Sequence, residues 1–151
     1  MLKIADQIKE AIKTLELSDN EIRLCRKDEG DAVFTKAKNT FVNDDPRVWW
    51  LSLAHPYKSY YFEDSKGFER LGEYIPNNEE SFWFIPELEE DEIQQVFETT
   101  VDTLIKVIGE CIGFEYNLVS KNFDWLIVEN DHNEILVVTL TDNKSDVALF
   151  Q

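Results

Sequence analysis

One short segment of this chain combines carboxylates with an imidazole. Residues 129–134, Glu-Asn-Asp-His-Asn-Glu, lie between two apolar stretches. Carboxylates beside a histidine can bind a divalent metal or exchange protons near neutral pH. Asparagine and aspartate are also the residues that a tight hairpin needs at positive φ. The segment is therefore interpreted as a turn or, alternatively, as a site formed by Glu129, Asp131 and His132. Turn chemistry does not account for Glu129.

The other histidine, His55, lies in an aromatic segment. It precedes Pro56, which restricts its backbone to extended conformations. Tryptophan, tyrosine and arginine are enriched at the positions that contribute most to protein interfaces. The segment could therefore line a ligand groove or a protein-binding patch, or it could pack as the core and rim of a small domain. The residues concerned are Arg47, Trp49, Trp50, His55, Tyr57, Tyr60 and Tyr61.

The sequence carries none of the common motifs for nucleotide, metal or nucleophile chemistry. Its two histidines lack HExxH or HxH spacing, and its five glycines form no GxGxxG, P-loop or GxSxG motif. Cys25 and Cys111 form no CxxC pattern and are expected to be reduced thiols. We predict no intrinsic metal site and no cofactor, and a non-enzymatic role is favoured over an enzymatic one.

The composition is that of a folded domain. The chain has 151 residues, of which 43% are hydrophobic and 13% aromatic. This length predicts a single domain over residues 1–151. No apolar run is long enough for a secretory signal or a membrane span, so a cytoplasmic location is expected.

The charge is strongly negative and unevenly distributed. The formal net charge is −16, and residues 79–115 hold eleven acids and one base. Phosphate is repelled by such a surface, so nucleic acid and anionic membranes are disfavoured as partners. A protein partner with a basic surface remains, although the acids could also serve only solubility. Glu79, Glu80 and Glu89 are predicted to help attract such a partner.

Hydrophobic spacing predicts short elements in the first half of the chain. Ile4, Ile8 and Ile12 predict an amphipathic helix over residues 2–17. The Asp45-Pro46 capping signal favours a helix over a strand before Pro56. The other predicted elements are a strand over 21–26, a turn at 28–30, a helix over about 33–41, a strand at 60–62 and a short helix from Asp64 to Pro76.

The second half predicts one long helix and a set of strands. Residues 82–85 are apolar on both faces and predict an interior strand. A stripe through Ile93, Phe97, Leu104 and Ile108 predicts a helix over about 88–112 that packs onto the sheet. Strands are predicted over 114–120, 124–129, 134–140 and 146–150, and their short turns require antiparallel neighbours. The predicted fold is α+β, a mostly antiparallel sheet with a C-terminal meander packed against one long helix and several shorter N-terminal helices.

Several motifs are similar to those of a known group of proteins. They include the Trp49-Trp50 pair, FWFIPE at residues 82–87, FEY at 114–116 and DWLIVENDH at 124–132. These motifs resemble an uncharacterised bacterial family of small acidic domains of unknown function. Its members often carry a histidine at the position of Asp131. Because this chain lacks that imidazole, the resemblance gives less support to the prediction of a metal site at this hairpin. The resemblance implies no activity.

Three functions are compatible with these observations. The first is a non-enzymatic protein-interaction module; by analogy of size and charge, this includes an immunity-type inhibitor of a toxin. The second is an enzyme or metal-binding domain centred on Glu129, Asp131 and His132, with His55 as a further member. The third is a structural domain whose charge serves only solubility.

Overall fold

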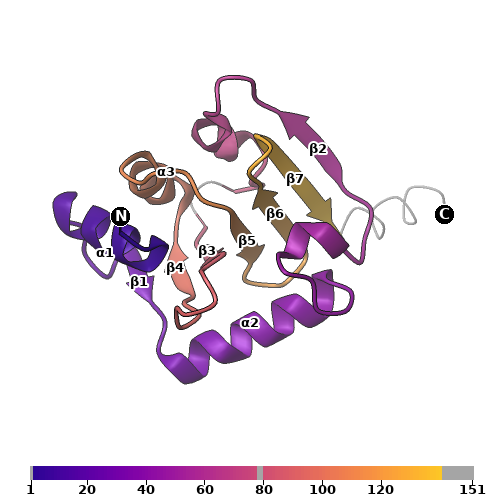
Figure 1. The fold of residues 1–151 in the computed structure, drawn as a ribbon, viewed down its shortest axis with the longest axis horizontal. Helices are drawn as coiled ribbons and strands as arrows, with labels where there is room; N and C mark the ends of the chain where they lie inside the picture. The colour runs from indigo at the N-terminus through magenta and orange to yellow at the C-terminus, as the bar shows by residue number, and fades with distance from the viewer. Residues whose placement is uncertain (1, 78–79, 141–151) are drawn as a thin grey trace.

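The described part of the protein is built on one antiparallel sheet. The computed structural model describes residues 2–77 and 80–140. Its seven strands are ordered β1-β4-β3-β5-β6-β7-β2, and every neighbouring pair is antiparallel (Figure 1). They are β1 (Ile22–Leu24), β2 (Lys58–Tyr61), β3 (Phe82–Pro86), β4 (Phe97–Thr99), β5 (Tyr116–Ser120), β6 (Trp125–Glu129) and β7 (Glu134–Thr139). The predicted α+β fold with a mostly antiparallel sheet is confirmed.

Helices cover both faces of this sheet. The helix α2 (Lys27–Phe41) and the 3₁₀ helix η1 (Trp49–Ser52) pack on one face. The other face is covered by α1 (Ile4–Thr14), the 3₁₀ helix η2 (Gly67–Glu73) and α3 (Val101–Gly109). Among the described residues, no helix has the length and apolar character to cross a bilayer.

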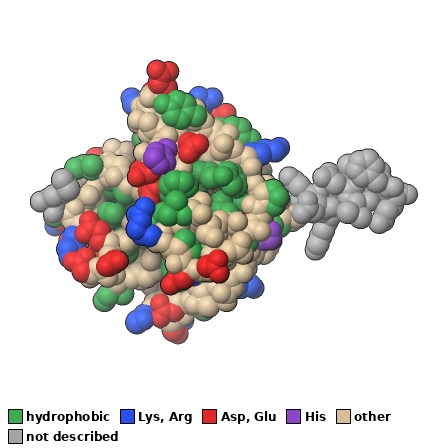
Figure 2. Space-filling view, turned by 45° about the vertical axis from the view of Figure 1, so that its right-hand side comes forward, with side chains coloured by type: hydrophobic (Ala, Val, Ile, Leu, Met, Phe, Trp, Pro, Cys, Tyr) green, Lys and Arg blue, Asp and Glu red, His purple; other side chains and the backbone are tan. Residues whose placement is uncertain are grey.

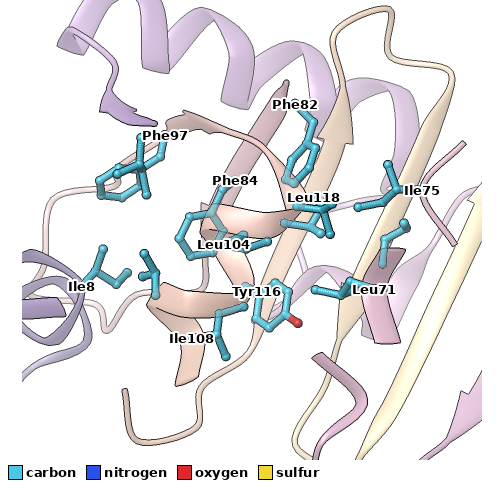
Figure 3. Packing of buried hydrophobic residues seen from close by; sticks show 14 of the residues in the cluster. Ile8, Leu71, Ile75, Phe82, Phe84, Phe97, Leu104, Ile108, Tyr116 and Leu118 are labelled. Carbon is cyan, nitrogen blue, oxygen red and sulfur yellow. The ribbon is translucent and has the colours of Figure 1, made fainter. Parts of the chain in front are cut away.

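The core on the α3 face is rich in aromatic side chains. Phe84 of β3 and Tyr116 of β5 face Leu104 and Ile108 of α3 (Figure 3). The centroid of the Phe84 ring lies 5.6 Å from that of Phe97 and 5.9 Å from that of Tyr116. Every side chain of β3 is buried, as predicted for an interior strand. A second core on the opposite face packs α2 and Trp49 against β3, β5, β6 and β7.

The prediction of one helix over 88–112 is wrong. Only Val101–Gly109 is helical, and Phe97–Thr99 forms β4 between β1 and β3. Leu104 and Ile108 are buried as predicted and Phe97 is buried from a strand, whereas Ile93 is 77% exposed. Strand β4 pairs with the backbone edges of both neighbours, which a continuous helix would leave without partners. Tertiary pairing therefore overrides the helical spacing of this segment.

Two local predictions in the first half are also wrong. The turn predicted at 28–30 belongs to α2, where Gly30 packs against Val96; a Cβ at Gly30 would lie 3.6 Å from the Val96 side chain. The Asp45-Pro46 signal does not start a helix, because Val48 is still extended and the 3₁₀ turn begins at Trp49. The strand predicted at 60–62 is confirmed as β2. The strand predicted over 146–150 lies outside the described residues.

Candidate functional site

The segment after β6 forms a hairpin turn. The Asn130 Oδ1 atom accepts hydrogen bonds from the backbone N–H groups of His132, at 2.9 Å, and Glu134, at 3.1 Å. Its Nδ2 atom donates to the Glu134 carboxylate at 3.0 Å. Asn133 adopts a positive φ of 61°. The asparagines therefore have the roles that turn chemistry predicts, and Asp131 and His132 project from the turn as exposed side chains.

The structure brings this hairpin against the aromatic segment. The Trp50 indole and the His132 imidazole meet edge to face, with ring centroids 5.5 Å apart. The Glu115 carboxylate joins the two segments, because it accepts the Trp50 Nε1–H at 2.7 Å and the Asp131 backbone N–H at 2.9 Å. His132 Nε2 also lies 3.5 Å from the Asp131 carboxylate. Two groups that were separate in the sequence analysis thus meet at one end of the sheet.

A second carboxylate, Glu87, supports the same corner of the molecule. It accepts the backbone N–H of Trp49 and the Nδ2–H of Asn117, both at 3.1 Å. Burial raises the pKa of Glu87, and these two donors partly offset that rise. Asn117 is fully buried, and its Oδ1 atom has no hydrogen-bond partner. Glu87 therefore anchors the start of η1 to the centre of the sheet.

These contacts bring together several motifs that were singled out in the sequence. The Trp49-Trp50 pair, the acid that ends FWFIPE, the acid of FEY and the turn at residues 130–132 all meet in this network. Sequence analysis missed Glu87, Glu115 and Asn117 as network members. The available signal was an acidic residue directly beside an apolar strand, a position where a carboxylate is costly unless it is hydrogen-bonded.

Glu129 lies on the opposite side of the hairpin from the Trp50–His132 contact. It is the cross-strand neighbour of Tyr116. The Tyr116 hydroxyl is directed at the Glu129 carboxylate and stabilises its charged form. Burial raises the pKa of Glu129, and burial together with the Glu129 charge raises that of Tyr116. Among the described residues, Glu129, Asp131 and His132 are not grouped as the ligands of a metal ion would be.

Glu129 lines a cavity of about 510 Å³. The cavity lies between the end of α3, the loop before η2 and the 130–133 turn. Its walls include Asp64, Lys66, Phe68, Phe114, Glu129 and Asp131. Its polar side chains include three carboxylates and one lysine, and its apolar wall contains two aromatic rings.

Within residues 2–77 and 80–140, no three histidine, cysteine or acidic side chains are grouped to hold a metal ion. Burial raises the pKa of Cys25 and that of Cys111 to about 11. Both thiols are therefore protonated at neutral pH, where a thiolate nucleophile would be required.

The predicted aromatic binding residues separate into buried and exposed groups. Trp49 is buried and Trp50 half-buried, and both serve the network described above. His55 is also half-buried, and its Nε2 atom lies 2.8 Å from the Thr40 carbonyl oxygen. In contrast, Tyr57 is 51% exposed and Tyr61 66% exposed, while Tyr60 packs on Tyr74 with a centroid distance of 4.6 Å. The tyrosines of β2 and its preceding turn therefore remain on the surface.

The acids between residues 79 and 92 do not form one uniform surface. Asp91 pairs with Lys3, and Glu92 accepts the Ala5 backbone N–H at 2.9 Å at the start of α1. Glu80 and Glu89 are exposed but lie beyond opposite ends of β3, and Glu79 is outside the described residues. Two of these acids, Asp91 and Glu92, thus contact the N-terminal segment.

We expect Glu129→Gln to stabilise the protein at neutral pH. Because burial raises the pKa of Glu129 above its unfolded value, folding disfavours the charged form. The cost of burial is fully present above the folded pKa and disappears as the carboxyl is protonated. The advantage of Glu129→Gln should therefore be largest at pH 7.5 and shrink as the pH falls towards 5.

Denaturant unfolding at several pH values measures this effect. The exposed Glu90→Gln substitution is the matched control, and it should change stability little at any pH. A lower stability of Glu129→Gln than of the wild type at pH 7.5 would contradict the prediction.

The comparison with family models gives a match over nearly the whole chain. Neither the curated proteins nor the solved structures include a significant match to it. Residues 1–147 match the model of a family described as a family of unknown function, DUF6756. That range includes every element of the sheet and all residues of the Glu87–Glu115 network. The chain therefore belongs to the DUF6756 family of unknown function.

Proposed function

We propose that this chain is a non-enzymatic protein-interaction module that binds its partner along β2. The observation that carries the proposal is the exposure of Tyr57, directly before this strand, and of Tyr61 within it, at 51% and 66%. Tyrosine supplies a large contact area and a hydroxyl group at low cost in side-chain entropy. Figure 2 shows hydrophobic side chains gathered on one face of the molecule, bordered by charged side chains and histidine.

The backbone of β2 supports the same surface. Among the described strands only β7 pairs with it, so no described strand occupies the opposite edge of β2. The Phe62 N–H donates to the Asn133 carbonyl oxygen at 2.9 Å, and antiparallel pairing alternates along the strand. The peptide groups of Ser59 and Tyr61 therefore point outward. A partner strand could pair with them while the tyrosines contact its side chains.

The charge of the chain suggests the chemistry of the partner. With a net charge of −16, the domain attracts a protein with a basic surface. An immunity-type inhibitor of a bacterial toxin is one role of this kind, and it agrees with the size of the chain. The exposed acids Glu89 and Glu90 can contribute to attraction, whereas Asp91 and Glu92 are already engaged with α1.

The alternative, an enzyme or metal-binding domain centred on the Glu129–His132 hairpin, has weaker support. Asn130 is used to build the turn, and the His132 ring packs against Trp50. Glu129 faces Tyr116 on the other side of the hairpin. Most polar groups of the hairpin therefore have a structural role.

Comparative capture of partners tests the proposal. The tagged wild type is compared with Tyr57→Ala/Tyr61→Ala in cells that naturally produce the protein, with chemical crosslinking and mass spectrometry. The matched control is Leu24→Ala/Ile93→Ala, which removes side chains that are 50% and 77% exposed near the other edge of the sheet. We expect at least one basic protein to be captured by the wild type and the control, and to be lost with the tyrosine variant.

An unchanged set of captured proteins would contradict the proposal. If the wild type, the tyrosine variant and the control variant all capture the same proteins, β2 is not the binding surface. Unfolding curves of the purified variants show that loss of capture does not reflect loss of fold, because exposed substitutions should change stability by at most about 0.5 kcal/mol each.

A further inference from the structure

The cavity beside Glu129 contains a carboxylate without a countercharge. Among the described residues, no cation lies within ion-pair distance of Glu129, although Lys66 belongs to the wall of the same cavity. The cavity wall carries the carboxylates of Asp64, Glu129 and Asp131 against this single ammonium group. The local balance of formal charge is therefore negative.

Tyr116 reaches Glu129 from the buried side of the sheet. Its hydroxyl group is directed at the Glu129 carboxylate and stabilises the charged form. Tyr116 is fully buried and does not belong to the cavity wall. A carboxylate can accept several hydrogen bonds, so Glu129 keeps acceptor capacity towards the cavity that it lines.

The size and walls of the cavity restrict what could bind there. Its volume of about 510 Å³ is in the range of sites for small organic molecules. Phe68 and Phe114 provide aromatic surface, and Ile108 adds aliphatic surface. Aromatic rings attract cations as well as apolar groups. A ligand with an apolar body and a charged nitrogen would match both parts of the cavity.

We propose that this cavity binds an organic cation, a primary amine or guanidinium group attached to an apolar body, with its nitrogen at Glu129. An ammonium or guanidinium group has only hydrogen-bond donors, which complements the carboxylate of Glu129, a group with only acceptors. Such a charge-assisted contact is stronger than one between neutral groups. The cation is either a free amine or a basic side chain of another protein. This site is separate from the tyrosine surface of β2 and does not depend on it.

Calorimetric titration of the purified protein tests the proposal. The probes are phenethylamine and its neutral counterpart 2-phenylethanol, followed by a short arginine peptide and the same peptide with citrulline. Phenethylamine should bind with a dissociation constant below about 1 mM, as its small size allows. The two counterparts that lack the cationic group, 2-phenylethanol and the citrulline peptide, should bind at least about tenfold more weakly. Binding of the free amine identifies a small-molecule ligand, and binding of the arginine peptide alone identifies a protein side chain.

Three variants locate the binding site. Glu129→Gln keeps the shape of the side chain and removes its charge, so affinity for the cation should fall by about 10- to 100-fold. Gly113→Leu adds a side chain beside the cavity where a Cβ would meet no atom within 4 Å, and it should block binding without disturbing the fold. Glu90→Gln changes the net charge by the same amount elsewhere and should bind as the wild type does.

Two results would overturn the proposal. One is the failure of both cationic probes to bind at concentrations up to about 10 mM. The other is equal affinity of a cation for the wild type and Glu129→Gln, which would place any binding elsewhere on this acidic protein. Neither result would affect the proposed role of β2, because Tyr57 and Tyr61 are not part of the cavity wall.

Discussion

Glu87→Ala is expected to lower the free energy of unfolding by about 2–5 kcal/mol. The substitution removes the acceptor for two donors, the Trp49 backbone N–H and the Asn117 side-chain amide. Each buried donor that loses its acceptor costs about 1–3 kcal/mol. Asn117 would keep only its 3.3 Å contact with the Ile85 carbonyl oxygen. Denaturant unfolding followed by tryptophan fluorescence measures the loss.

Glu87→Gln is the matched control for this substitution. The amide keeps an oxygen that can accept from Trp49 and Asn117, and it removes a charge whose burial raises the pKa of Glu87. Its stability should therefore be close to that of the wild type at neutral pH. If Glu87→Ala were as stable as Glu87→Gln, the network would not anchor the Trp49–Trp50 segment.

Phe84→Ala should be at least as destabilising, by about 3–5 kcal/mol. Phe84 is fully buried at the centre of β3, and its ring contacts those of Phe97, Phe114 and Tyr116. Removing it leaves a cavity between the sheet and α3 that these large rings cannot close. The midpoint of thermal unfolding should fall by about 6–20 °C for a protein of this size.

The control for the core substitution is Ile93→Ala. Both wild-type residues are large and apolar, but Ile93 is 77% exposed and so contributes little buried area. Its replacement should change stability by no more than about 0.5 kcal/mol. If Ile93→Ala lowered stability as much as Phe84→Ala, the Ile93 side chain would be buried. Residues 88–96 would then pack onto the sheet as the helical spacing predicted, which would contradict the structure described above.

The strands and turns were largely predictable because their signals are local. The apolar run at 82–85 and the asparagines at 130 and 133 are each explained by nearby residues. The division of residues 88–112 into strand β4 and helix α3 was not predictable in the same way. Phe97 and Leu104 have helical spacing, but residues 97–99 pair with β1 and β3, which are distant in sequence. That pairing depends on tertiary structure, so the spacing of the hydrophobic residues does not indicate it.

The candidate site was predicted only in part for a similar reason. The tyrosines near β2 and the hairpin at 129–134 were recognised by residue type. Glu87 and Glu115 were read as part of a general acidic surface, because their donors, Trp49 and Trp50, are 38 and 65 residues away in sequence. The unusual position of Glu129 was noted, whereas its neighbour Tyr116 depends on the register between β5 and β6.

The measurement that tests the central claim most directly is the dissociation rate of the complex with the captured partner. Tyr57→Ala/Tyr61→Ala should dissociate about tenfold faster or more, as expected for the loss of central interface residues. Leu24→Ala/Ile93→Ala should dissociate at the wild-type rate. Charge reversal at Glu89 and Glu90 should chiefly slow association, and added salt should reduce that difference. A wild-type dissociation rate for the tyrosine variant, or faster dissociation only for the Leu24 and Ile93 variant, would contradict a binding surface at β2.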